Sequence, residues 1–251
     1  MGPSDWLDNH SEPGQTFGEY SRSRHIRLTE KRNVLYVLPL GEFDDKQMEI
    51  VKLSAEFLGH FFMCEVKTLE TQDLDVIPEK ARRVHPQWGM RQIHSWHVLH
   101  RVLAPQLPDD AVALIALTSS DLYPQESWNF VYGQASLSKR VGVWSIFRNG
   151  DPETEFETVL LRTLKTATHE TGHMFSIEHC IAYECNMCGA NNRQESDQHP
   201  AYLCPECLPK IWWSTHCDPA ERFEKLQKFC EANNLPEEAD YYRRALEIVK
   251  D

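Results

Sequence analysis

The chain alternates between short apolar runs and longer segments in which apolar residues recur at helical spacing. The runs 33–40 and 111–118 are almost wholly apolar, which is typical of strands buried on both faces. Residues 61–69, 128–136 and 139–148 give weaker strand patterns, and helical spacing covers 44–57, 90–103 and 154–175. Strands that alternate with helices predict a mixed α/β sheet.

The last of these helices, 154–175, carries both an apolar stripe and two histidines. The stripe consists of Phe156, Val159, Leu160, Leu164, Ala167 and Met174. At about 100° per residue these positions share one side of the helix, while His169 and His173 lie on the other. We therefore expect the stripe to pack on the sheet and the histidines to face a cleft.

Charge and cysteine content narrow the classes of protein. The net charge of −12 argues against nucleic acid and anionic membranes as partners, because both require a basic surface. The N-terminus has no apolar signal core, and no apolar run approaches the roughly 18 residues of a membrane span, so we expect a cytoplasmic protein. Six of the eight cysteines fall between Cys180 and Cys217, which in a reducing compartment favours metal binding over disulfides.

The strongest chemical signal is the sequence His169-Glu170-Thr171-Gly172-His173, followed six residues later by His179. Histidines at i and i+4 lie one helical turn apart on one face, so both rings can reach one ion. Because His179 is too distant to share that face, the helix must end and the chain must turn to bring it back. Three histidines with one open position are typical of a catalytic zinc site.

The same spacing gives Glu170 a catalytic role. It lies at the flank of the histidine pair, where it can act on a zinc-bound water without being a ligand. We expect zinc to polarise an amide carbonyl while Glu170 takes the proton from the water and passes it to the leaving amine.

The cysteines that follow predict a second, structural zinc site. Cys204 and Cys207 form a C-x2-C pair. Their partners are either Cys180 with Cys185, or Cys185 with Cys188, since both spacings suit a closed tetrahedral site. Such a metal would fix the segment that returns His179 and Met187 to the active site.

With these residues in place, the segment from His169 to Cys207 resembles the archaemetzincins, a branch of the metzincin zinc peptidases. The shared pattern comprises the three histidines and the glutamate, a cysteine directly after the third histidine, the x4 step to Cys185, Met187, and the C-x2-C pair. Residues 128–136 and 141–148 also look like the strands that precede the helix in that family. The resemblance covers most of residues 33–215.

The resemblance implies a compact metzincin-like α/β (α+β) zinc peptidase domain. It would have a mixed twisted sheet packed on a long active-site helix, a cysteine-zinc loop and C-terminal helices. It also implies two Zn2+ ions per chain, with Met187 beneath the catalytic one as a Met-turn. The structural ligands would be Cys180, Cys185, Cys204 and Cys207, with Cys188 as an extra thiol, and the substrate would lie along an edge strand near residues 133–137.

One residue departs from the family pattern inside the motif. Metzincins normally have glycine three residues after the second histidine, where the helix turns sharply, but this chain has Ser176. A non-glycine residue at positive φ costs on the order of 1 kcal/mol. Either the turn avoids that conformation, or the strain is tolerated because metals fix both ends of the segment.

These expectations define an organisation and two functional hypotheses. We expect a loosely ordered N-terminal arm over 1–30, a catalytic domain over 31–215, and C-terminal helices over 216–251 packed on it. The leading hypothesis is a monomeric zinc metallopeptidase that acts on peptides or proteins and has no nucleic acid or membrane partner. The alternative is a catalytically weak or inactive zinc-stabilised peptide- or protein-binding module of the same fold.

Overall fold

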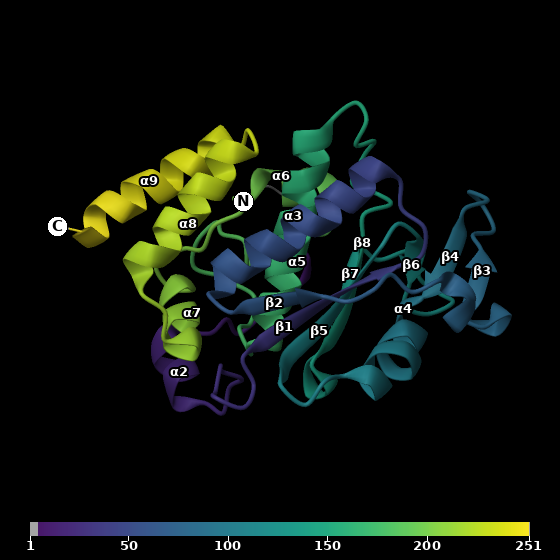
Figure 1. The fold of residues 1–251 in the computed structure, drawn as a ribbon, viewed down its shortest axis with the longest axis horizontal. Helices are drawn as coiled ribbons and strands as arrows, with labels where there is room; N and C mark the ends of the chain where they lie inside the picture. The colour runs from purple at the N-terminus through teal and green to yellow at the C-terminus, as the bar shows by residue number, and fades with distance from the viewer. Residues whose placement is uncertain (1–4, 251) are drawn as a thin grey trace. The chain divides into compact units, whose positions relative to one another are not determined.

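The computed structural model describes residues 5–250, which group into two compact units (Figure 1). One unit contains residues 28–59 and 64–174 and holds the sheets. The other contains residues 5–27, 60–63 and 175–250 and is mainly helical. Residues 1–4 of the expected arm lie outside the described residues.

The sheet unit is built on a five-stranded mixed sheet with the order β2-β1-β5-β8-β7. Strands β1, β2, β5 and β8 are parallel to one another, and β7 runs antiparallel to β8 at the end of the sheet. Both apolar runs of the sequence are central strands here, and every residue in them is buried because helices cover both faces. The strands are β1 (Val34–Leu40), β2 (Glu65–Thr68), β5 (Ala111–Thr118), β7 (Gly133–Ser136) and β8 (Val141–Ser145).

Helices cover the two faces of this sheet (Figure 1). Alternate β1 residues, including Tyr36 and Leu38, pack in one core with Val98, Leu99 and neighbouring residues of a helical stretch. The long helices α3 (Asp45–Phe62) and α5 (Phe156–Met174) lie together on the opposite face, with the Lys46 ammonium 5.0 Å from the Phe156 ring. The apolar stripe of α5 is buried as the sequence predicted, except for Phe156, which is half-buried. The histidine-bearing side of the helix is also only half-buried. The helical stretch comprises α4 (Ser95–His97), a π-helical turn η3 (Val98–Leu103) and η4 (Ala104–Gln106).

A second, three-stranded sheet corrects part of the sequence analysis. It consists of β3 (Arg82–Val84), β4 (Arg91–His94) and β6 (Asp121–Tyr123). Residues 91–94, expected to begin a helix, instead form a strand that pairs with β6. The reason is a long-range polar network around Asp121, whose fully buried carboxylate accepts hydrogen bonds from Arg148 and Gln92. Shorter elements of this unit are η1 (Leu74–Val76), η2 (Glu79–Ala81) and η5 (Leu137–Lys139).

The helical unit contains the first and the last of the described residues and the cysteine-rich segment. Its helices are α1 (Trp6–Asn9), α2 (Phe17–Arg22), α6 (Arg193–Gln198), α7 (Leu208–Thr215), α8 (Pro219–Ala232) and α9 (Pro236–Lys250). Helix α8 begins at an Asp218 cap and packs on α9. Arg222 of α8 is buried, and its Nε donates to the carbonyl of Phe61 at 2.8 Å.

The N-terminal residues carry more structure than the expected loose arm. Helix α2 has a capping box: the side chain of Thr16 accepts a hydrogen bond from the backbone N–H of Glu19, and the side chain of Glu19 accepts one from the backbone N–H of Thr16. Tyr20 is fully buried, and its hydroxyl donates to the Phe175 carbonyl at 2.8 Å. The sequence did not show this, because the contacts that order the segment lie more than 150 residues away. Among residues 5–250, no helix is both long and apolar enough to cross a bilayer.

A close approach at Gly142 on β8 gives a testable prediction for the fold. A Cβ at this position would lie 2.1 Å from Cη2 of the buried Trp144 and 2.4 Å from Cε of Met174. Gly142→Ala should therefore lower the free energy of unfolding by about 1–3 kcal/mol through overpacking. Urea unfolding checks this, with Gly18→Ala as control, since that glycine is not at positive φ and a Cβ there would meet no atom closer than 3.8 Å. Equal stabilities of Gly142→Ala and wild type would contradict the prediction.

Candidate metal centres

The C-terminal end of α5 carries the first pair of candidate ligands. The Nε2 atoms of His169 and His173 lie 3.0 Å apart, with ring planes at 89° and ring centroids 4.6 Å apart. This separation is close to the about 3.3 Å expected for two nitrogens on one zinc ion. Glu170, also half-buried, lies beside β7, since a Cβ built on Gly133 would be 3.6 Å from its Cγ.

Helix α5 ends at Met174, and the chain turns at Ser176 with a φ of +68°. Of the two possibilities that the sequence left for this turn, the structure has the left-handed conformation. The strain is offset by contacts that glycine could only partly make: Ser176 Oγ accepts from the backbone N–H of Ile26 at 3.2 Å. Its carbonyl also accepts from Gln15 Nε2 at 3.1 Å. The serine therefore binds the N-terminal segment through two hydrogen bonds.

His179 follows the turn and is held by a residue that the sequence analysis did not single out. Its Nδ1 lies 2.7 Å from Oε1 of Glu12, which also accepts from Trp6 Nε1 at 3.0 Å. Burial raises the pKa of the Glu12 carboxyl, but the hydrogen bonds from His179 and Trp6 outweigh it and lower the pKa overall. Glu12 is therefore a carboxylate at neutral pH, and it can only accept the Nδ1 proton.

Two groups of side chains among residues 5–250 could hold a metal ion. One is His169, His173 and His179, and the other is Cys180, Cys185, Cys204 and Cys207. Within each group the ligand atoms lie within 4.8 Å of one another. Imidazole nitrogens and thiolates are the donors that zinc prefers, so the residues present fit this ion.

The four cysteines form a buried group suited to a closed site. The Sγ atoms of Cys180 and Cys204 are 3.7 Å apart, which matches the about 3.8 Å edge of a tetrahedral zinc–thiolate site. Hydrogen bonds from the other cysteines, Cys185 first, lower the pKa of Cys180, and the Cys180 thiolate in turn raises the pKa of Cys185 to about 12. It also raises the pKa of Cys204 and Cys207. A divalent cation would remove this mutual repulsion and hold all four as thiolates.

Cys188 and Met187 lie beside this group in different ways. The Cys188 thiol is half-buried, donates to the carbonyl of Tyr183 at 3.0 Å and is outside the group of four. Met187 is 1% exposed, and its carbonyl accepts from the N–H of Cys180 at 2.8 Å. That hydrogen bond ties Met187 to the backbone directly after His179.

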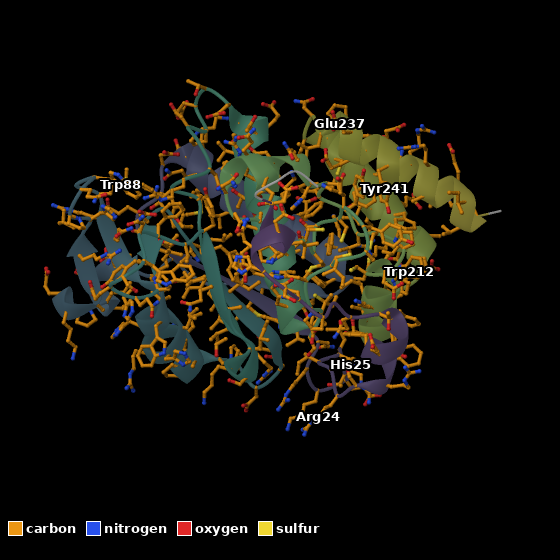
Figure 2. The ribbon with its side chains drawn as sticks, turned by 180° about the vertical axis from the view of Figure 1, so that it is seen from behind. Arg24, His25, Trp88, Trp212, Glu237 and Tyr241 are labelled. Atoms are coloured by element: carbon orange, nitrogen blue, oxygen red, sulfur yellow. The ribbon has the colours of Figure 1, made fainter. Side chains whose placement is uncertain are left out.

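The C-terminal helices contact the cysteine-rich segment near Cys204. Tyr241 of α9, labelled in Figure 2, stacks on Tyr202 with ring centroids 3.6 Å apart. Its hydroxyl donates to the carbonyl of Leu203, next to Cys204. Stacked aromatic pairs contribute about 0.5–1.5 kcal/mol beyond their buried area. The cysteine segment is therefore fixed by packing as well as by its thiols.

Comparison with known proteins places the chain in a family. Residues 101–212 match the profile of peptidase family M54. Archaemetzincin-2 from Rattus norvegicus is 31% identical over 268 residues, covering 93% of this chain and 74% of the relative. The chain belongs to the archaemetzincins. The resemblance seen in the sequence is thereby confirmed, and so is the expected enzyme class, a zinc metallopeptidase.

Archaeal archaemetzincins share the fold. The relative from Archaeoglobus fulgidus is 31% identical over 177 residues, 70% of this chain and 98% of its own. Its crystal structure with malonate has a TM-score of 0.56 and 29% identity over 70% of this chain and 99% of that one. The Methanopyrus kandleri archaemetzincin has a TM-score of 0.57 and 27% identity, covering 72% and 93% of the two chains. The predicted mixed α/β class is confirmed.

The Ser176 turn gives a prediction about stability. Ser176→Ala keeps the positive φ but loses the hydrogen bond from Ile26, so it should lower the free energy of unfolding by about 1 kcal/mol. Ser176→Gly loses the same bond but removes strain of about 1 kcal/mol, so it should be near neutral. Urea unfolding of both variants checks this. A clear stabilisation by glycine would mean that the serine hydroxyl contributes nothing.

Metal content gives a second prediction. Cys207→Ser removes a fully buried member of the cysteine group, so zinc per chain should fall by one ion and the melting temperature should drop. Cys188→Ser is the matched control, because its thiol is outside the group, and it should keep the wild-type zinc content. Elemental analysis with thermal unfolding measures both. Equal zinc loss in the two variants would reassign the ligands.

Proposed function

We propose that this archaemetzincin hydrolyses peptide bonds with Glu170 as general base and with zinc held by His169, His173 and His179. The observation that carries the proposal is the position of Glu170. Its half-buried side chain lies beside Gly133, the first residue of the edge strand β7, and it directly follows His169, whose Nε2 atom is 3.0 Å from that of His173. A carboxylate there can reach both a water at the metal site and a peptide along the strand.

The metal and Glu170 have different roles in the proposed reaction. When bound, zinc supplies a Lewis acid that polarises a carbonyl oxygen and makes water more acidic. The Glu170 carboxylate accepts the proton of the attacking water and then delivers it to the nitrogen of the leaving amine. Because Glu170 directly follows His169 on α5, the helix fixes the distance between the base and the site.

Substrate binding is proposed at the free edge of β7 (Gly133–Ser136). This strand is the last in the five-stranded sheet, and among residues 5–250 it pairs with β8 on one side only. An extended peptide can add to such an edge through backbone hydrogen bonds. Gly133 lies next to Glu170, so a peptide in that register would have its carbonyl groups beside the proposed base.

We further propose that Cys180, Cys185, Cys204 and Cys207 hold a second, structural zinc ion, and that Met187 forms the Met-turn of a metzincin site. The support is the burial of all four thiols and the hydrogen bond between the Cys180 N–H and the Met187 carbonyl. A metal held there would fix the chain on both sides of Met187. Two metal ions would then fix the conformation of the chain from His169 to Cys207.

The decisive variant is Glu170→Gln, which keeps the shape of the side chain and removes the base. We expect kcat for cleavage of a peptide library to fall by about 10²–10⁴-fold with both metals retained. Mass spectrometry of the products and elemental analysis of the variant measure the two quantities. Glu178→Gln is the matched control, because it removes an exposed carboxylate from the same segment and should cleave like wild type.

Two outcomes would contradict this function. Equal cleavage by Glu170→Gln and wild type would remove Glu170 from the mechanism. If wild type binds peptides from the library and cleaves none, the chain is the peptide-binding module of the same fold, not an active peptidase.

A further inference from the structure

The N-terminal segment lies along the turn that leads from α5 to the third histidine. Gln15 accepts from the N–H of Glu178 at 3.4 Å in addition to its bond to Ser176. Gly14 packs against Ile181 so closely that a Cβ there would lie 2.5 Å from Cγ1. Together with Tyr20 and Ile26, these residues contact Phe175, Ser176, Glu178 and Ile181 of the stretch 175–181.

Within this arm, the Glu12 carboxylate fixes the tautomer of His179. Because Oε1 accepts from Nδ1 at 2.7 Å, the proton of the neutral ring is on Nδ1 and the lone pair is on Nε2. Nε2 is also the atom with which His169 and His173 face each other. The three histidines would therefore offer the same nitrogen.

Glu12 is itself held by contacts on both sides. Trp6 donates to it through Nε1, and the Trp6 ring lies edge-on to His179 at 5.4 Å. Trp6 also packs on Gly189, where a Cβ would lie 2.5 Å from its ring, and its N–H donates to Glu195 at 2.6 Å. At its other end the arm is fixed by Tyr20, whose hydroxyl donates to the Phe175 carbonyl and whose ring stacks on His25 at 4.4 Å.

We infer that Glu12 is a positioning residue for the catalytic metal: its carboxylate orients the His179 ring and keeps Nε2 available for the ion. The inference rests on the proposed role of the three histidines as ligands. Carboxylates that accept the second ring N–H of a ligand histidine fix its orientation and raise its basicity, and their loss typically weakens metal binding 10–100-fold. The arm is then part of the metal site, although it lies more than 160 residues away in sequence.

The test measures metal affinity on the full chain. Glu12→Ala should raise the Kd of the histidine-bound metal by about 10–100-fold, measured by competition with a chromophoric chelator. Glu12→Gln keeps an acceptor for Nδ1–H and loses only the charge, so its Kd should lie between those of wild type and Glu12→Ala. With Co2+ as the probe, the visible d–d absorption should change in Glu12→Ala, while the near-ultraviolet thiolate bands of the cysteine site should stay as in wild type.

Glu19→Gln is the matched control. It removes one carboxylate from the same arm, and glutamine can keep the capping box of α2, so its Kd and spectrum should equal those of wild type. An unchanged Kd and Co2+ spectrum in Glu12→Ala would overturn the inference, as would an equal loss in Glu19→Gln. Faster cleavage by Glu12→Ala with unchanged affinity would show that the arm blocks the site instead. Because affinity is read without substrate, a failure of peptidase activity is distinguishable from a failure of this inference.

Discussion

The path of the backbone between His173 and His179 is the constraint on which the site depends. A helix presents two histidines one turn apart, but it carries a third ligand six residues later away from their face. Instead, α5 ends at Met174 and the chain turns at Ser176, which has a positive φ. That conformation is unfavourable for serine, and hydrogen bonds from Ile26 and Gln15 offset its cost.

The two candidate metal centres share this short stretch of chain. Cys180 directly follows His179, and its N–H donates to the carbonyl of Met187. After the turn, this hydrogen bond ties Cys180 to Met187, and before Cys180 the N-terminal segment contacts the chain through Tyr20, Gln15 and Glu12. Long-range contacts therefore hold the stretch that carries His179 on both sides.

The elements predicted from the sequence agree with the structure where local interactions determine them, and disagree where contacts between distant residues do. The strand at 111–118 could be predicted to the residue, because a strand buried on both faces is apolar throughout. Residues 91–94 were expected to be helical and form a strand instead, because the buried carboxylate of Asp121, from a distant part of the chain, pairs with Gln92 and Arg148. The pattern of apolar residues along a short segment does not reveal a partner that is distant in the sequence.

The sequence by itself determined the chemistry: the spacing of His169, Glu170, His173 and His179 and of the cysteines is local, and local spacing fixes which donors can meet on a helix or in a short loop. It also selected the family. Only the tertiary structure decided how Ser176 is accommodated and which residue faces the second nitrogen of His179. Both answers lie in the N-terminal segment, 150 and 167 residues away, in a stretch whose composition had suggested a loose arm. Long-range hydrogen bonds of this kind follow from how the chain packs, and no periodic pattern encodes them.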